Sequence, residues 1–184
     1  MKQNEKPVFV LQSASNIDRL VSVYRATKRS GRILYEDNYT ALIAAAAGGK
    51  IPRPDVFTDV YAFTPRAVVG KRLDMFFEIK HKRGLKGIAN GTKRFTMLVR
   101  PTMLDYLKKL CTVADIKEAT LIYSMWNGYK ETDYMSEFLS EIQTLGIKVV
   151  DLHTSGHATE QDIELLKQTV NAKQTVCVHT ELRT

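Results

Sequence analysis

The hydrophobic pattern divides the first part of the chain into alternating strand-like and helix-like segments. The apolar run VFVLQ at 8–12 predicts a buried strand, and ILYED at 33–37 predicts a second one. Between them, apolar side chains recur with the i, i+3, i+4, i+7 spacing of one helical stripe, at Ile17, Leu20, Val21 and Tyr24. Ser15 or Asn16 can cap the start of this helix, and Gly31 can end it.

The segment YTALIAAAA at 39–47 predicts a second helix, closed by Gly48 and Gly49. A strand, helix, strand, helix succession with short joints is typical of right-handed βαβ units. Such units build parallel sheets. The sequence therefore predicts an α/β fold with a parallel sheet and helices on both faces.

The same two patterns continue to the C-terminus. Further strands are expected at 59–63, 95–100, 119–125, 147–154 and 174–180. Further helices are expected at 72–84, 102–110, 134–146 and 159–170, and Pro101 suits the first turn of the second of these. In the helix at 134–146 the predicted inward stripe consists of Tyr134, Phe138, Ile142 and Leu145.

Composition narrows the class of protein and of partner. The 184 residues are 44% apolar and 26% charged, enough to bury a core, and the net charge of +7 favours a partner that carries phosphates. Cys111 and Cys177 lie in apolar stretches and are expected to be small buried residues rather than a disulfide. No segment suggests a membrane span, so we expect a cytoplasmic protein with no membrane partner.

Three of the four histidines lie near predicted strand ends. His153 follows the strand at 147–154, and His157 precedes the next helix, with Ser155 and Gly156 as a tight turn between them. His179 ends the last predicted strand. The carboxyl edge of a parallel sheet is where ligands bind, and a turn before a helix offers N–H groups to an anion. We interpret these residues as functional, although a single histidine at a strand end is more often a structural residue.

The segment DLHTSGHAT, with VHTE about twenty residues later, resembles the C-terminal signature of RNA-processing metallo-β-lactamase proteins that carry a β-CASP insert, such as ribonuclease J. This resemblance implies that His157 is a catalytic-site residue and that His153, Ser155 and Gly156 contact the substrate phosphate. It also implies that His179 is a zinc ligand, although Thr180 stands where the family often has glycine.

The segment FVLQSASNIDRLVSVYRATKRSGRILYEDNYTALI is similar to the beginning of a β-CASP domain, in which a polar cluster faces the nucleic-acid backbone. Carried over by position, the cluster is Ser13, Ser15, Asn16 and Arg19. The segments RPTMLDYLKKL and LIYSMWNGY resemble the return of the insert to the lactamase domain. The resemblance implies a β-CASP-like domain at 1–115, followed at 116–184 by the C-terminal β-α-β portion of a metallo-β-lactamase domain.

One part of the family pattern is missing. The HxHxDH motif that supplies most zinc ligands is absent from this chain, and the only other histidine is His81. A hydrolytic zinc site needs at least three protein ligands and an open position for water. We therefore expect a fragment of an RNA hydrolase that binds two zinc ions when complete. We expect those sites to be unfilled in this chain, which should be inactive alone. The expected partners are RNA or another nucleic acid and the missing N-terminal half of the lactamase domain, and a homodimer is compatible with the sequence.

Two other readings stay open. The chain can be a non-catalytic nucleic-acid-binding α/β module that uses the basic stretch at 80–94, or a generic doubly wound fold with a site for a phosphate ester. Glu36 and Asp37 can act as acid and base or, as we prefer, orient a loop and cap the following helix. Trp126 and Tyr129 can stack on a base, although packing between domains is the role we favour.

Overall fold

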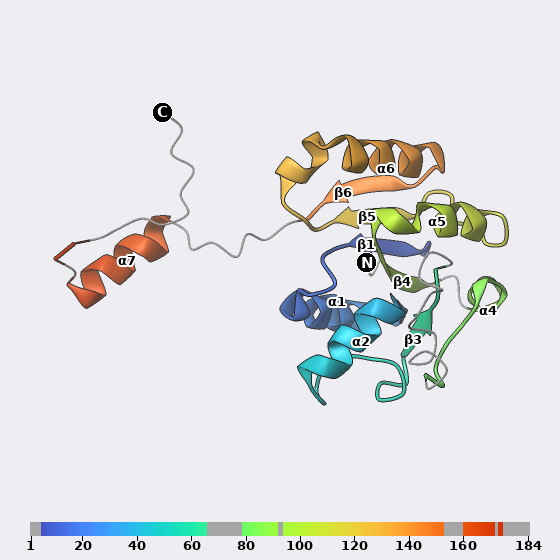
Figure 1. Cartoon of the computed structure of the whole chain (residues 1–184), viewed down its shortest axis with the longest axis horizontal. Helices are drawn as coiled ribbons and strands as arrows, with labels where there is room; N and C mark the ends of the chain where they lie inside the picture. The colour runs from blue at the N-terminus through green and yellow to red at the C-terminus, as the bar shows by residue number, and fades with distance from the viewer. Residues whose placement is uncertain (1–4, 66–78, 92–93, 153–159, 172, 175–184) are drawn as a thin grey trace. The chain divides into compact units, whose positions relative to one another are not determined.

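Six parallel strands form one sheet in the computed structural model of the chain, which describes residues 5–65, 79–91, 94–152, 160–171 and 173–174 (Figure 1). The strands are β1 (Val8–Leu11), β2 (Ile33–Asp37), β3 (Val60–Phe63), β4 (Phe95–Val99), β5 (Thr120–Tyr123) and β6 (Lys148–Asp151). Their order across the sheet is β3-β2-β4-β1-β5-β6, and every neighbouring pair is parallel. The predicted α/β class with a parallel sheet is confirmed.

Helices connect the strands and cover the sheet. They are α1 (Ile17–Arg29), α2 (Asn38–Ala47), the short α4 (Leu85–Ala89), α5 (Leu104–Cys111), α6 (Asp133–Thr144) and α7 (Glu160–Val170). Two 3₁₀ helices precede α5 and α6, namely η2 (Pro101–Met103) and η3 (Asn127–Glu131). Pro101 lies in the first turn of η2, which continues directly into α5, so the predicted place of this proline is confirmed.

Apolar side chains fill both faces of the sheet. Successive residues of a strand point to opposite faces, so Val10 and Leu11 belong to different clusters. On one face, α1 and α2 pack on the strands through Leu20, Tyr24 and Ala44. On the other face, α4, α5 and α6 contribute Ile88, Leu107 and Phe138 to a larger cluster. The layers are helix, sheet and helix (Figure 1).

The helix predicted at 72–84 is wrong over its last residues. Residues 72–78 lie outside the described residues, and 79–84 do not form a helix. Instead, the backbone at His81 and Arg83 pairs with Ala62 of β3, with N–O distances of 2.8 Å in both bonds. The sequence also gave no sign of α4, which lies inside the glycine-containing basic stretch. Ile88 of this helix is buried against the core.

The inward stripe of α6 also differs from the prediction at one residue. Phe138 and Ile142 are buried as expected, and Met135 joins them. Tyr134 is 55% exposed, because its position places it outside the stripe of Met135, Phe138 and Ile142. Leu145, just after the helix, packs at the border of the core. The predicted strand at 174–180 lies outside the described residues except for Gln174.

The chain forms two compact units, residues 1–153 and 154–184. Strands β5 and β6, which follow the expected boundary at 115 and 116, belong to the same sheet as the strands before it. The assignment of 1–115 and 116–184 to two family domains therefore stays a proposal. Cys111 is a half-buried free thiol, whereas Cys177 lies outside the described residues. None of the described helices has the length and apolar character needed to cross a membrane.

Candidate functional site

The topology of the sheet places a crevice between the carboxyl ends of β1 and β4. These strands are neighbours, with Leu11 opposite Val99. The chain leaves β1 through α1 toward β2, on one face, and leaves β4 through α5 toward β5, on the other face. Adjacent strands whose connections diverge in this way open a ligand-binding crevice at the carboxyl edge of doubly wound sheets. The residues after these two strands are therefore the first candidates for a site.

The turn from β1 to α1 carries the four residues that the resemblance places near a nucleic-acid backbone. Ser13 and Ser15 are exposed, and their hydroxyl oxygens are 2.9 Å apart, within hydrogen-bond distance. The Oδ1 atom of Asn16 accepts a hydrogen bond of 3.0 Å from the backbone N–H of Arg19 and so caps α1. The structure thus brings all four residues to one turn at the carboxyl edge. Asn16, one of the two predicted caps, is the residue that performs that role.

Arg19 connects this turn to the neighbouring strand. Its guanidinium donates a hydrogen bond to the backbone carbonyl of Ser124, directly after β5. The N–H of Ser124 in turn donates to the carbonyl of Leu11 at the end of β1, over 2.9 Å. The ends of β1 and β5 are therefore tied together. The positive charge of Arg19 is thereby held at the carboxyl edge, next to the end of β5.

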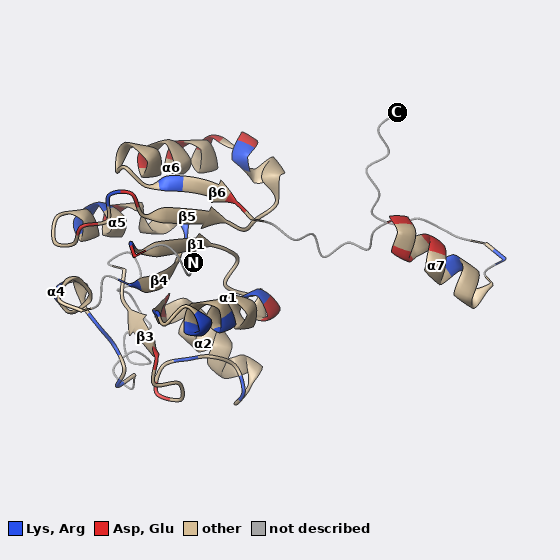
Figure 2. Cartoon of the chain, turned by 180° about the vertical axis from the view of Figure 1, so that it is seen from behind, with Lys and Arg blue, Asp and Glu red and all other residues tan. Residues whose placement is uncertain are grey.

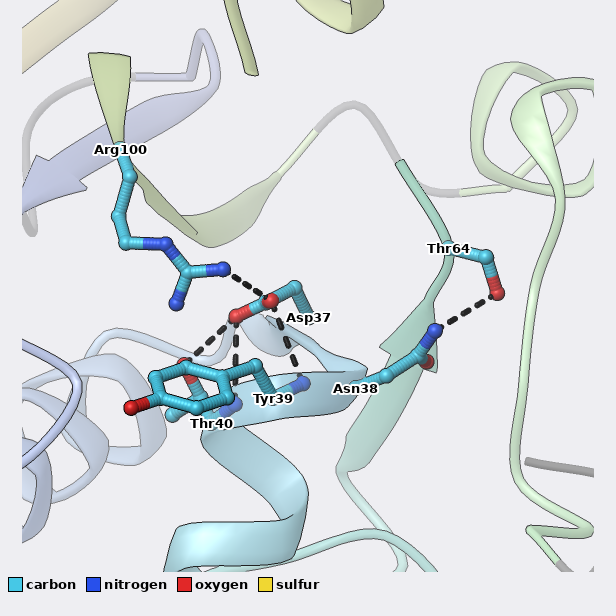
Figure 3. Close-up of polar contacts among 6 residues, drawn as sticks. All are labelled: Asp37, Asn38, Tyr39, Thr40, Thr64 and Arg100. Atoms are coloured by element: carbon cyan, nitrogen blue, oxygen red, sulfur yellow. Dashed lines mark hydrogen bonds and ion pairs between the residues drawn. The ribbon is translucent and has the colours of Figure 1, made fainter. Parts of the chain in front are cut away.

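A second polar group lies at the ends of β2 and β4 (Figure 3). The buried carboxylate of Asp37 forms an ion pair with Arg100 and accepts a 2.6 Å hydrogen bond from the Thr40 hydroxyl. It also accepts from the backbone N–H groups of Tyr39 and Thr40, so it caps α2. The guanidinium of Arg100 lies 5.0 Å from the centre of the Tyr39 ring. The interpretation of Asp37 as a helix cap is confirmed.

Between these groups, a narrow hollow with no room for a water molecule contains buried polar atoms. Gln12 is 3% exposed and lines the hollow together with Asp37 and Arg100. Within the described part of the chain, neither polar atom of the Gln12 side chain has a hydrogen-bond partner, and neither does Nη1 of Arg100. Buried polar groups are normally satisfied, so these atoms are exceptions within the fold.

Glu36 differs from its neighbour Asp37. It is fully buried, and its position in β2 places it on the same face as Leu34. Neither carboxylate oxygen has a hydrogen-bond partner among the described residues. Burial, and secondarily the charge of Asp37, raise the pKa of Glu36 well above its ordinary value. Since Asp37 caps α2 and Glu36 lies inside the fold, the two carboxyls do not form a paired acid and base at an open site.

A larger cavity of about 860 Å³ lies by the carboxyl end of β3, on the face covered by α5. Lys82, Arg83 and Lys109 line it, with Asp105 as the acidic residue among its described lining. Arg83 lies 4.1 Å from the centre of the Tyr61 ring and donates a 3.1 Å hydrogen bond to the Tyr35 hydroxyl. Figure 2 shows Lys and Arg along α1 and along the segment that leads into α4. The basic stretch predicted at 80–94 therefore borders a cavity over part of its length.

The structure does not describe the predicted zinc and phosphate residues. His153, Ser155, Gly156, His157 and His179 fall outside the described residues. Strand β6 ends at Asp151, two residues before His153. Among the residues that the structure describes, no three His, Cys, Asp or Glu side chains come together as a metal site. The described part therefore supplies no ligand set for a zinc ion.

His81 has a separate environment. Its ring stacks on Tyr61 with centroids 5.6 Å apart, and its backbone N–H donates to Asp55 over 2.6 Å. This residue therefore packs near β3.

Sequence reasoning missed Gln12 and Arg100 as parts of the site. Arg100 stands between the strand FTMLV and Pro101, and a charged residue directly after an apolar strand was the available signal. Its partner Asp37 lies 63 positions away, and no local pattern connects the two. Gln12 was included in the predicted first strand, but its side chain was not considered for a site.

No protein-family model matches the sequence, and a comparison with curated proteins gives no match either.

Proposed function

We propose that this chain is the RNA-holding part of a zinc-dependent hydrolase of the metallo-β-lactamase class with a β-CASP insert, and that it does not cleave RNA alone. In this proposal, RNA phosphates lie along the carboxyl edge of the sheet, at the turn from β1 to α1. His157 would act at the scissile phosphate, with His153, Ser155 and Gly156 beside it. His179 would contribute one zinc ligand, and a bound zinc ion would supply an activated water.

The observation that carries the proposal is the arrangement of Ser13, Ser15 and Arg19. Two exposed hydroxyls, and a guanidinium that donates to the Ser124 carbonyl, lie at the carboxyl edge, where a doubly wound sheet binds its ligands. Hydroxyl and guanidinium groups are the usual side-chain contacts to phosphate oxygens, and they carry no sequence preference. Such a group suits a phosphodiester backbone better than an apolar ligand.

Charge supports the same partner. The chain has a net charge of +7, and Lys82, Arg83 and Lys109 gather around the larger cavity. Lysine and arginine supply most of the sequence-independent affinity for nucleic acid. A strand held at the carboxyl edge could therefore continue toward this cavity, which also borders on Thr64 after β3 and on Thr102 before α5.

A second polypeptide segment is part of the proposal, because the HxHxDH motif is absent from this chain. Within its own unit, α7 carries the apolar residues Ile163, Leu165, Leu166 and Val170, which are between 39% and 63% exposed. Apolar surface of this kind is normally covered in the finished protein, by another part of the same chain or by a second polypeptide.

The first experiment tests whether the chain is active by itself. Purified protein is incubated with single-stranded RNA and zinc, with and without a chelator. We expect no cleavage above a no-protein control, since a hydrolytic site needs three protein ligands. RNase activity that the chelator abolishes would show that the chain holds a complete metal site, contrary to the proposal.

The second experiment tests RNA binding at the predicted place. Fluorescence anisotropy of a labelled single-stranded RNA is measured at increasing salt. Arg19→Ala is expected to weaken binding about tenfold and to reduce the salt dependence by about one released ion. Arg25→Ala removes the same charge from an exposed position of α1 and is the matched control. Equal effects of both substitutions would mean that only net charge matters, and no binding at low salt would reject the proposal.

Substitution of the histidines distinguishes the hydrolase proposal from the alternative of a non-catalytic RNA-binding module. If the chain is only a nucleic-acid-binding module, RNA affinity should survive His157→Ala and His179→Ala, singly and together. In the hydrolase reading, His157→Ala should weaken binding of RNA because it borders the scissile phosphate. Addition of a polypeptide that carries the HxHxDH half should then restore cleavage to the wild-type chain and not to the His157→Ala variant.

A further inference from the structure

Trp126 is the only tryptophan of the chain and lies at the carboxyl edge of the sheet. It follows β5 by three positions and is 55% exposed. Its neighbour Met125 packs against the hydrophobic core, whereas Trp126 is not part of either core cluster. Large aromatic side chains bury much area when they find a partner, so an exposed one at a candidate site suggests a contact surface.

The indole ring has close neighbours although it is exposed. A Cβ atom added at Gly128 would overlap the six-membered part of the Trp126 ring, so the ring lies directly against the glycine backbone. The Tyr129 ring meets it edge-to-face, with centroids 5.6 Å apart and an interplanar angle of 87°. The carbonyl of Trp126 accepts a 2.9 Å hydrogen bond from the Tyr123 hydroxyl. A ring fixed in this way loses little further freedom when a ligand stacks on it.

The surroundings of the ring favour a nucleic-acid ligand. Ser124, two positions before Trp126, accepts the hydrogen bond of Arg19. Strands β1 and β5 are neighbours, so the hydroxyls of Ser13 and Ser15 lie after the adjoining strand. Phosphate-binding groups and an aromatic ring thus follow two neighbouring strands. Proteins that bind single strands combine groups for the backbone with aromatic rings for the bases.

We propose that Trp126 stacks on an unpaired base of RNA bound at the carboxyl edge, with Gly128 and Tyr129 as the residues that hold its ring in place. This inference rests on the proposed RNA binding at Ser13, Ser15 and Arg19. It adds a preference for single-stranded RNA. In a duplex the bases are stacked on each other, so their faces are not accessible to an aromatic side chain. Stacking tolerates any base, so little sequence preference is expected.

The emission of Trp126 provides a direct test, because no other tryptophan contributes. We expect single-stranded RNA to quench this emission. Inorganic polyphosphate, which offers phosphates without bases, should bind at low salt and quench much less. RNA that binds by anisotropy and leaves the emission unchanged would overturn the inference and leave the proposed function intact. RNA that does not bind at all would reject the proposed function itself.

Substitutions give a second readout. Trp126→Leu is expected to weaken binding of single-stranded RNA about tenfold and to leave polyphosphate affinity unchanged. Trp126→Phe, which keeps a smaller ring, should lose less. Equal losses for RNA and polyphosphate would mean that the substitution acts through the fold around Arg19, and this would overturn the inference. Unchanged RNA affinity would also overturn it and would indicate that the exposed ring contacts a polypeptide.

Gly128→Ala changes the position of the Trp126 ring without removing the ring. The new methyl group must displace the indole, so we expect RNA affinity to fall in the same direction as in Trp126→Leu, with altered tryptophan emission in the free protein. Gly49→Ala is the matched control, because a Cβ there meets no atom within 4 Å. Circular dichroism and urea unfolding establish that each variant is folded. A folded Gly128→Ala with wild-type RNA affinity would contradict the role of Gly128.

Discussion

The two halves of the carboxyl edge use polar residues in different ways. At β2 and β4, the side chain of Asp37 is 1% exposed and is held by Arg100 and Thr40. At β1 and β5, the hydroxyls of Ser13 and Ser15 and the ring of Trp126 are exposed. The Asp37 carboxylate finds its partners inside the protein, whereas the hydroxyls and the indole ring at β1 and β5 are exposed. This difference supports the proposal that the β2–β4 half stabilises the edge and that the β1–β5 half binds the ligand.

Arg100→Ala should have the largest effect and should act on stability. The Asp37 carboxylate would stay buried without its cation, and loss of one partner from a buried pair costs about 3–5 kcal/mol. We expect a value near the low end, about 3 kcal/mol, because Asp37 keeps its hydrogen bonds to Thr40. Urea unfolding measures it, with Arg25→Ala as the exposed control. RNA affinity that falls as much as in Arg19→Ala, with little loss of stability, would reverse the roles of the two halves.

Glu36→Gln should stabilise the protein at neutral pH. The folded-state pKa of Glu36 is raised by burial, so wild-type stability is fully present below the ordinary value of 4.5 and falls as pH rises toward the folded-state pKa. The amide does not ionise and avoids this loss. We expect a gain in the free energy of unfolding above that window and none below it.

Thermal unfolding across the pH range measures this difference. The exposed Glu137→Gln in α6 is the control and should not change the curve. If the wild type and Glu36→Gln lose stability in parallel as pH rises, Glu36 is not the group responsible.

Asn16 caps α1 and also belongs to the proposed RNA-binding turn, so two substitutions at this residue can distinguish its effect on stability from its effect on RNA binding. Asn16→Ala removes the cap of α1 and should lower the free energy of unfolding by about 1 kcal/mol. Asn16→Asp keeps a capping oxygen, so stability should be retained, while the new negative charge repels phosphates and RNA affinity should fall. Urea unfolding and RNA anisotropy are measured on both variants. If Asn16→Asp binds RNA as tightly as the wild type, the phosphate path does not pass this turn.

The smallest effect is expected for the serines. Ser13→Ala combined with Ser15→Ala should reduce RNA affinity by about three- to tenfold, because each hydroxyl is expected to donate to a phosphate oxygen. Both side chains are exposed, so the midpoint of urea unfolding should not move. The control is Ser22→Ala on α1, whose hydroxyl donates to the carbonyl of Asp18. A large loss of stability in the double variant would place these serines with the scaffold.

The sequence predicted the sheet well for a physical reason. Strands buried on both faces read as short continuous apolar runs, and β2 was predicted with its observed bounds. Prediction failed where long-range pairing decides the backbone. Residues 79–84 looked helical, but His81 and Arg83 pair with Ala62 of β3. In α6, Tyr134 looked like part of the inward stripe, but Met135 lies there instead.

In the candidate site, too, contacts between residues close in sequence were predictable, whereas contacts between distant residues were not. The turn from β1 to α1 was predicted, since its residues are close in sequence. The ion pair of Asp37 with Arg100 and the hydrogen bond of Arg19 to Ser124 join residues 63 and 105 positions apart, and local patterns do not reveal such contacts. The family resemblance contributed the roles of His153, His157 and His179, which stay predictions.

The sequence by itself determined the α/β class, the places of most strands and helices, and the positive charge that favours a phosphate-bearing partner. These properties follow from local periodicity and composition. Only the tertiary structure decided the strand order and therefore the crevice between β1 and β4. It also decided that Asp37 is buried in an ion pair while Trp126 is exposed beside Ser124. Burial and pairing depend on which distant segments meet, so polar groups are buried in one half of the edge and exposed in the other.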